Sequence, residues 1–172
     1  MRTLEKIGFG GGCHWCTEAV FQSLKGVEKV EQGWIGSEAD ASSFSEAVIV
    51  HFDASQIPLK VLIEIHLYTH KSSSQHSMRT KYRSAIYYFK TAQQPKVKAI
   101  LNSFQSKFND ELITQVLPFL KFKASGKDIE NYYYKNPKKP FCESFINPKL
   151  KFLLSNFMNF TNTEKLKHLN NN

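Results

Sequence analysis

The order of short apolar segments along the chain constrains its fold more than any other feature of the sequence. Residues 4–9 are typical of a strand, and residues 13–24 form a helix pattern that feeds apolar side chains into a core. Further strands are expected over 27–34, 47–52 and 84–89, helices over 58–68, 95–108 and 148–160, and an edge strand interrupted by Pro118 over 114–122. Strands and helices alternate without a strict strand–helix–strand repeat. We therefore expect an α+β fold, a two-layer sandwich with helices packed on a mixed sheet that has a ferredoxin-like core.

The length of 172 residues fits one domain, and no linker divides the chain. We expect a single domain over residues 1–160. Residues 161–172 are polar and are expected to form a mobile C-terminal tail.

The net charge of +8 is spread along the sequence, and no nucleic-acid-binding motif accompanies the lysines. We therefore expect no nucleic-acid partner. No apolar run is long enough to span a bilayer, and the N-terminus lacks the pattern of an export signal. Three cysteines, an odd number, argue against a structural disulfide framework. These features predict a cytoplasmic protein without a membrane partner, which we expect to be a monomer.

The stretch GFGGGCHWCTE, residues 8–18, carries two of the three cysteines. A cysteine where a glycine turn enters a helix has unpaired N–H groups and the positive end of the helix dipole beside its sulfur, so Cys13 should have a lowered pKa. The glycines let a substrate approach that sulfur closely. Cys16 lies one turn further on, and we interpret it as a small residue packed against the sheet rather than a redox group.

Several motifs in the same order resemble the A-type peptide methionine sulfoxide reductases. The family signature, Gly-Cys-Phe-Trp followed by a small residue, a variable residue and Glu, is similar to residues 12–18 within the longer match of residues 10–34. Residues 45–48 resemble the family's acidic residue before a strand, and residues 81–87 its Gln-Tyr-Arg-Ser-Ala-Ile-Tyr motif. Glu130, Asn136-Pro137 and Phe141-Cys142 resemble its C-terminal segment. Enzymes of this class return methionine sulfoxide to methionine.

The resemblance implies a role for each matching residue. Cys13 is similar to the nucleophile that attacks the sulfoxide sulfur and becomes a sulfenic acid. Trp15 matches an aromatic wall for the substrate's methyl group. Glu46 matches the acid that protonates or hydrogen-bonds the sulfoxide oxygen, and Tyr82 a phenol that bonds the same oxygen. His14 stands where the family has phenylalanine, and we expect its neutral ring to stack in the same substrate pocket.

Turnover requires a second thiol, because a sulfenic acid must be resolved. By resemblance this thiol is Cys142, which we expect in a mobile, proline-bearing loop over 136–142. An internal Cys13–Cys142 disulfide would then be reduced by thioredoxin or another dithiol. The resemblance implies no bound cofactor or metal. It also implies preference for the S epimer, in oxidised proteins or as free methionine sulfoxide.

The sequence departs from the family pattern in three segments. Residues 36–46 form a short loop without the family's second phenol, so the second oxygen donor is unassigned. Residues 72–79 replace a conserved polar segment, and His76 or Ser77 is a candidate for the local hydrogen bonds. Residues 143–148 replace a glycine-rich loop, and no cysteine follows Cys142.

Two other functions fit parts of the motif. A thioredoxin-like disulfide oxidoreductase would use Cys13 and Cys16 directly, since their spacing permits a disulfide. A metal-binding module would combine Cys13, His14 and Cys16 with one of His66, His70 or His76.

Overall fold

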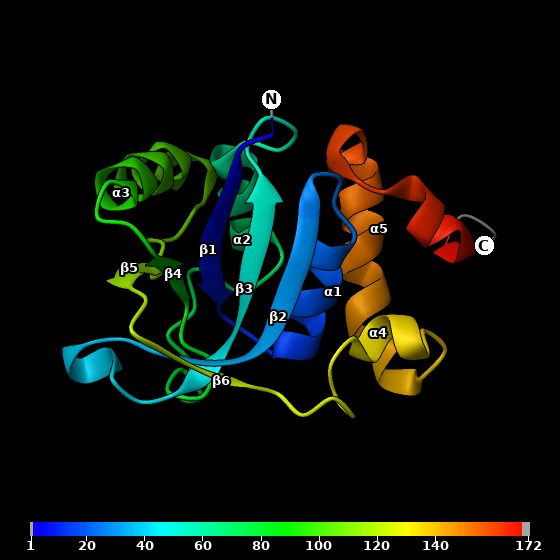
Figure 1. Cartoon of the computed structure of the whole chain (residues 1–172), viewed down its shortest axis with the longest axis horizontal. Helices are drawn as coiled ribbons and strands as arrows, with labels where there is room; N and C mark the ends of the chain where they lie inside the picture. The colour runs from blue at the N-terminus through cyan, green and yellow to red at the C-terminus, as the bar shows by residue number, and fades with distance from the viewer. Residues whose placement is uncertain (1, 170–172) are drawn as a thin grey trace.

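A computed structural model describes residues 2–169 of the chain. It contains one mixed sheet of six strands in the order β5-β4-β1-β3-β2-β6 (Figure 1). The strands are β1 (Leu4–Gly10), β2 (Val27–Gly36), β3 (Ser45–Asp53), β4 (Ala85–Tyr88), β5 (Gln115–Pro118) and β6 (Lys121–Ala124). The α-helices are α1 (His14–Gln22), α2 (Leu59–Tyr68), α3 (Gln93–Phe104), α4 (Tyr132–Lys135) and α5 (Asn147–Asn156). A π-helix over Cys142–Ile146 leads directly into α5.

The central four strands have the ferredoxin-like arrangement that the sequence predicts. The chain runs β1-α1-β2-β3-α2-β4, and β3 lies between β1 and β2 while β4 pairs with the other edge of β1. These pairings are antiparallel, whereas β5 runs parallel to β4 and makes the sheet mixed. The α+β prediction is thus confirmed.

The main hydrophobic core lies between the sheet and the helices. Ile7 and Phe9 of β1 and Val48 of β3 have no exposed surface and join apolar side chains of α1, α2 and α5. The alternation along β3 turns Ala47 and Ile49 to the opposite face, where they form a smaller cluster. Because β1 is the strand that leads into α1, this layering fixes the position of the glycine turn between them.

The predicted edge strand over 114–122 is instead two strands at opposite edges of the sheet. Pro118 ends β5, which pairs with β4, and the chain then crosses to β6, which pairs with β2. Proline has no N–H to extend a ladder, so the interruption seen in the sequence is a real break. The periodicity of the segment could not show that its two halves pair with different strands.

The C-terminal segment differs from the mobile tail predicted over 161–172. Residues 163–169 form a 3-10 helix, and Thr161 and Leu166 have no exposed surface. Thr161 pairs with Leu24, and the His168 ring is 2.6 Å from the Tyr133 hydroxyl. The domain therefore extends beyond residue 160. Residues 170–172 of the predicted tail lie outside the described residues.

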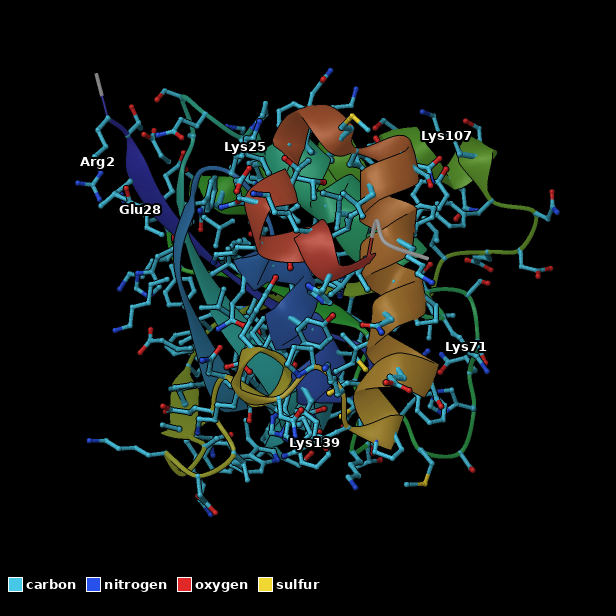
Figure 2. All side chains as sticks on the ribbon, turned by 90° about the vertical axis from the view of Figure 1, so that its right-hand side faces the viewer. Arg2, Lys25, Glu28, Lys71, Lys107 and Lys139 are labelled. Carbon is cyan, nitrogen blue, oxygen red and sulfur yellow. The ribbon has the colours of Figure 1, made fainter. Side chains whose placement is uncertain are left out.

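The basic side chains are dispersed over the surface. In Figure 2 the labelled side chains of Lys25, Lys71, Lys107 and Lys139 lie apart from one another, as their spread in the sequence predicts. Within residues 2–169, no helix is long and apolar enough to cross a bilayer.

Candidate active site

Cys13 occupies the N-cap position of α1, directly after the glycine turn that follows β1. The backbone N–H groups of Cys16 and Thr17 both donate to its carbonyl oxygen, at 3.1 and 3.2 Å. Its side chain is half-buried and packs against the main core. The thiol therefore stands at the start of the helix, where the sequence predicts it.

The electrostatics of Cys13 favour a thiolate. A hydrogen bond from the Cys16 thiol is the largest cause that lowers the pKa of Cys13, and the backbone N–H groups of Trp15 and Cys16 act in the same direction. Burial and the charge of Glu46 oppose them. The same hydrogen bond, together with burial, raises the pKa of Cys16. Cys16 is thus a buried thiol of the apolar core that also favours the thiolate form of Cys13.

An open cavity of about 440 Å³ lies in front of Cys13. Most of its lining surface is apolar. The lining residues are Gly11, Gly12, Cys13, Cys16, His70, Lys71, His76, Met78, Tyr82, Phe141, Phe145 and Lys149. The cavity therefore offers an apolar side chain direct access to the nucleophilic sulfur and to one phenol.

Glu46 lies at the start of β3, with 6% of its surface exposed. Its Oε1 accepts a hydrogen bond from the backbone N–H of His14 at 3.2 Å, which holds the carboxylate beside the residue that follows Cys13. Its Oε2 lies 3.7 Å from the Nζ of Lys81. A carboxyl group and an ammonium group therefore meet next to the nucleophile.

The His14 ring points toward the sheet and does not line the cavity. Its Nδ1 lies 2.8 Å from the Gly33 carbonyl oxygen, and the ring meets Trp34 edge-on with centroids 5.1 Å apart. Burial lowers the pKa of His14, so the ring is neutral and Nδ1–H donates to Gly33. The neutral state matches the prediction, whereas the ring stacks on the sheet side, 3.4 Å from Glu46, instead of in the substrate cavity.

Trp15 also lies behind the cavity. Its ring stacks on Tyr132 with centroids 4.0 Å apart and meets Phe141 edge-on at 5.4 Å. Phe141 itself lines the cavity. The aromatic wall predicted at Trp15 is therefore presented to the cavity through Phe141, a residue that sequence reasoning noted only as the neighbour of Cys142.

Arg79 connects the glycine turn to the segment that carries Tyr82. Its Nη1 donates to the carbonyl oxygens of Gly11 and Tyr82, at 2.9 and 2.8 Å. The sequence pointed to His76 or Ser77 for such contacts. His76 Nδ1 accepts only a local bond from the backbone of Met78, and Ser77 is exposed. A guanidinium, with five N–H donors, can hold several carbonyl groups at once, which a single hydroxyl cannot.

Cys142 is fully buried at the start of the π-helix, not in the mobile loop predicted over 136–142. It belongs to the same apolar cluster as Cys16. Burial raises the pKa of its thiol. All three cysteines are unpaired in this structure. Cys13 packs against the same core cluster, and single-turn π-helices are frequent at functional sites.

Two histidines, the buried His66 and the half-buried His70, pack beside the glycine turn. His66 Nε2 lies 2.8 Å from the Gly10 carbonyl oxygen, and His70 Nε2 lies 2.8 Å from the Ser84 hydroxyl. The two rings stack with centroids 4.2 Å apart. Within the described residues no three histidine, cysteine or acidic side chains are grouped to hold a metal ion. The metal-binding alternative therefore has no ligand set in this part of the chain.

The comparisons with known proteins agree with the motif order. The sequence model of the family described as peptide methionine sulfoxide reductase matches residues 5–161. The chain belongs to this family. The peptide methionine sulfoxide reductase MsrA of Psychrobacter sp. (strain PRwf-1) is 32% identical over 91% of this chain and 98% of its own length. That of Acinetobacter baumannii (strain SDF) is 34% identical over 90% of this chain and 96% of its own length.

Solved structures of the family share the fold. Methionine sulfoxide reductase A of Corynebacterium diphtheriae superposes with a TM-score of 0.68 at 23% identity, covering 79% of this chain and 76% of that one. Mxr1 of Saccharomyces cerevisiae, in complex with Trx2, gives a TM-score of 0.59 at 18% identity over 76% of this chain and 84% of that one. Family membership over nearly the whole chain disfavours the thioredoxin-like oxidoreductase alternative.

Proposed function

We propose that this chain reduces the S epimer of methionine sulfoxide to methionine, in oxidised proteins or as the free amino acid. The observation that carries the proposal is the Cys13 thiol, whose pKa is lowered and which opens into an apolar cavity that Tyr82 also lines, while the backbone N–H of His14 holds Glu46 close by. An apolar cavity suits the methyl and methylene groups around the sulfoxide sulfur, while Tyr82 and Glu46 suit its oxygen. Phe141, supported by Trp15, forms the aromatic wall, and His14 supports Glu46 from the sheet side.

The reduction step transfers two electrons between sulfur atoms. The Cys13 thiolate attacks the sulfoxide sulfur, and Glu46 delivers a proton to the sulfoxide oxygen while Tyr82 hydrogen-bonds it. The Cys13 sulfur bonds to the substrate sulfur as the sulfur–oxygen bond breaks and the protonated oxygen leaves as water. Water then attacks the Cys13 sulfur and loses a proton, the bond between the two sulfurs breaks, methionine leaves with that electron pair, and the hydroxyl group remains on Cys13. The sulfoxide is thus reduced to methionine, and Cys13 is oxidised to a sulfenic acid. Without protonation, oxide would be a poor leaving group, which is why the step needs an acid.

The sulfenic acid is then resolved by a second thiol, with loss of water and formation of a disulfide. We propose Cys142 as this thiol, after local rearrangement of the π-helix. Cys16, whose thiol favours the Cys13 thiolate, is the other candidate for this step. The two routes differ in which disulfide accumulates.

The disulfide is reduced by thioredoxin or another dithiol protein, which regenerates both thiols and supplies the electrons for the next turnover. The solved complex of Mxr1 with Trx2 supports a thioredoxin as donor. We further propose that the chain works as a monomer in the cytoplasm, because its three free thiols are stable in a reducing compartment.

Site variants test the proposal directly. Wild-type protein with dithiothreitol should convert S-methionine sulfoxide to methionine and leave the R epimer. Cys13→Ser should lose at least about 1,000-fold in rate, since hydroxyl cannot replace thiolate as the nucleophile. Cys142→Ser should still release one methionine per enzyme but lose recycling by thioredoxin. Unchanged activity of Cys13→Ser, or equal use of both epimers, would refute the assignment.

Peptide mapping after one turnover without reductant identifies the resolving thiol. A Cys13–Cys142 disulfide is expected in the wild type, and Cys16→Ala should still form it. If the only disulfide joins Cys13 to Cys16, Cys142 is not the resolving residue. Mass spectrometry of Cys142→Ser should in turn show sulfenic acid on Cys13, trapped by a dimedone probe.

A further inference from the structure

We propose that Lys81 donates a hydrogen bond to the sulfoxide oxygen and stabilises the negative charge that develops there. This inference rests on the proposed function and adds a third oxygen-binding group to Glu46 and Tyr82. Three observations on the described residues carry it: where the Lys81 backbone is held, where its ammonium group lies, and how many donors that ammonium group has free.

The backbone of Lys81 is fastened to the strand that bears Glu46. Its carbonyl oxygen accepts a hydrogen bond from the backbone N–H of Glu46 at 3.0 Å and another from the Ser45 hydroxyl at 2.9 Å. Its own N–H donates to the Met78 carbonyl at 3.1 Å. Main-chain contacts thus hold the Lys81 backbone beside the Glu46 carboxylate, and its side chain extends from this fixed point.

The ammonium group lies between the two groups already assigned to the sulfoxide oxygen. Its Nζ is 3.7 Å from Oε2 of Glu46 and 5.1 Å from the centroid of the Tyr82 ring. Tyr82 is the largest influence that raises the pKa of Lys81, and Glu46 and Cys13 add to it. All three proposed catalytic groups therefore act on this one cation, which remains charged at neutral pH.

The ammonium group of Lys81 has N–H donors that are free to bind a ligand. It carries three N–H bonds, of which the contact with Glu46 uses at most one. The Lys81 side chain is 56% exposed, whereas that of Glu46 is only 8% exposed, so Lys81 can turn from the carboxylate toward a bound ligand. Tyr82 is the member of this cluster that lines the cavity, so a substrate bound there would lie beside the ammonium group and displace water from it, which strengthens a charged hydrogen bond.

The charge on the oxygen increases along the reaction. A sulfoxide oxygen is already partly negative, and it gains electrons as the bond to sulfur breaks. A donor that binds this oxygen more tightly in the transition state than in the ground state accelerates the step. Loss of one such donor in other enzymes lowers kcat by about 100-fold to 1,000-fold. For a half-exposed, flexible lysine we expect a smaller loss, about 10-fold.

The test compares Lys81→Met with Lys121→Met. Lys121 is also exposed, and its Nζ lies 5.4 Å from the Phe44 ring, but it is on β6, whereas the Nζ that approaches Glu46 and Tyr82 is that of Lys81. Both variants therefore lose one positive charge and one aromatic contact. The rate of methionine release is measured in a single turnover without reductant, so that only the reduction step is observed. Thermal unfolding of each variant checks that the fold is intact.

Lys81→Met should slow the single-turnover rate about 10-fold, with the KM for the sulfoxide changed less than 3-fold, and Lys81→Arg should recover most of the rate. Lys121→Met should match the wild type. Equal rates for Lys81→Met and Lys121→Met would overturn the role of Lys81, as would a change confined to KM, which would mean charge attraction of the substrate. Absence of methionine release by the wild type would instead refute the proposed function itself.

Discussion

His14 and His66 are buried as neutral rings and His70 is half-buried beside them, and all three contribute to how the fold responds to acid. Burial lowers the pKa of His66 to about 3 and that of His70 well below its ordinary value, and it also lowers the pKa of His14. The unfolded chain binds protons at these residues near pH 6.5. Below that pH the unfolded state holds more protons than the folded state, so stability falls as the pH falls.

His66 allows a direct measurement of this effect. The neutral His66 ring should reduce the free energy of unfolding by about 1.4 kcal/mol per pH unit between pH 6 and pH 4, a window that ends near its folded pKa of about 3. His66→Gln keeps a donor for the Gly10 carbonyl but removes the titrating ring. Its unfolding free energy, from urea titrations at pH 4, 5 and 6, should therefore fall less steeply by that amount. His51→Gln, which removes a partly exposed histidine, is the control, and equal slopes for His66→Gln and wild type would contradict the argument.

Among single residues, the sequence predicts those whose role depends on their neighbours in the chain. It misses those whose role depends on a partner that is distant in the sequence. Cys13 could be assigned because a glycine turn and a helix start are adjacent in the sequence. Lys81 and Arg79 could not, because their significance lies in Glu46 and Gly11, which β3 and the turn bring to them. The one available signal was their place directly before Tyr82, in a segment of otherwise small and polar residues.

The turn between β1 and α1 contains one glycine in a crowded position, Gly11, and one in an open position, Gly12. Gly11 has φ of 157°, and a Cβ atom there would lie 2.4 Å from Cδ2 of His70. A Cβ atom on Gly12 would meet nothing within 4 Å. Gly11 is therefore required by the packing of the His70 ring, whereas Gly12 keeps the approach to Cys13 open.

The two alanine variants should separate these roles. Gly11→Ala must displace the buried His70 ring or the turn, so it should lower the free energy of unfolding by about 1–3 kcal/mol. Gly12→Ala should change stability by less than about 0.5 kcal/mol, but its methyl group enters the cavity next to the sulfur and should raise the KM for methionine sulfoxide. Urea unfolding and steady-state kinetics on both proteins check this, and a stable Gly11→Ala or an unfolded Gly12→Ala would contradict it.

Elements with a strong local pattern were predicted, and those determined by their environment were not. The β-branched, apolar run of β3 and the proline at the start of α2 identified both elements to within about two residues. The π-helix at Cys142 has no such pattern: the prolines before it favour a loop, whereas in the structure it packs against α1 and α5 and is buried. The sequence therefore did not predict the helical, buried setting of the proposed resolving thiol.

At the scale of the whole molecule, the C-terminal segment joins the two parts that carry the cysteines. Lys165 Nζ donates to the Gln22 carbonyl at the end of α1, whose first residue follows Cys13. His168 contacts Tyr133 of α4, and the Tyr133 hydroxyl also donates to Asn147 at the start of α5. The segment was predicted as a mobile tail because its residues are mostly polar. Its few apolar side chains are nevertheless buried against the domain.

Leu166 is the anchor of this segment and permits a test of its contribution. It has no exposed surface, so Leu166→Ala should leave a cavity and cost about 2–3 kcal/mol, at the lower end of the usual range because a terminal segment can partly relax. For a domain of this size that loss lowers Tm by about 5–10 °C. Lys167→Ala, which removes only an exposed ion pair with Glu164, should shift Tm by less than about 2 °C.

If the segment is part of the cooperative unit, calorimetry should show one transition for both variants. An unchanged Tm for Leu166→Ala, or a separate low-temperature transition in the wild type, would show instead that residues 161–169 unfold independently of the reductase domain.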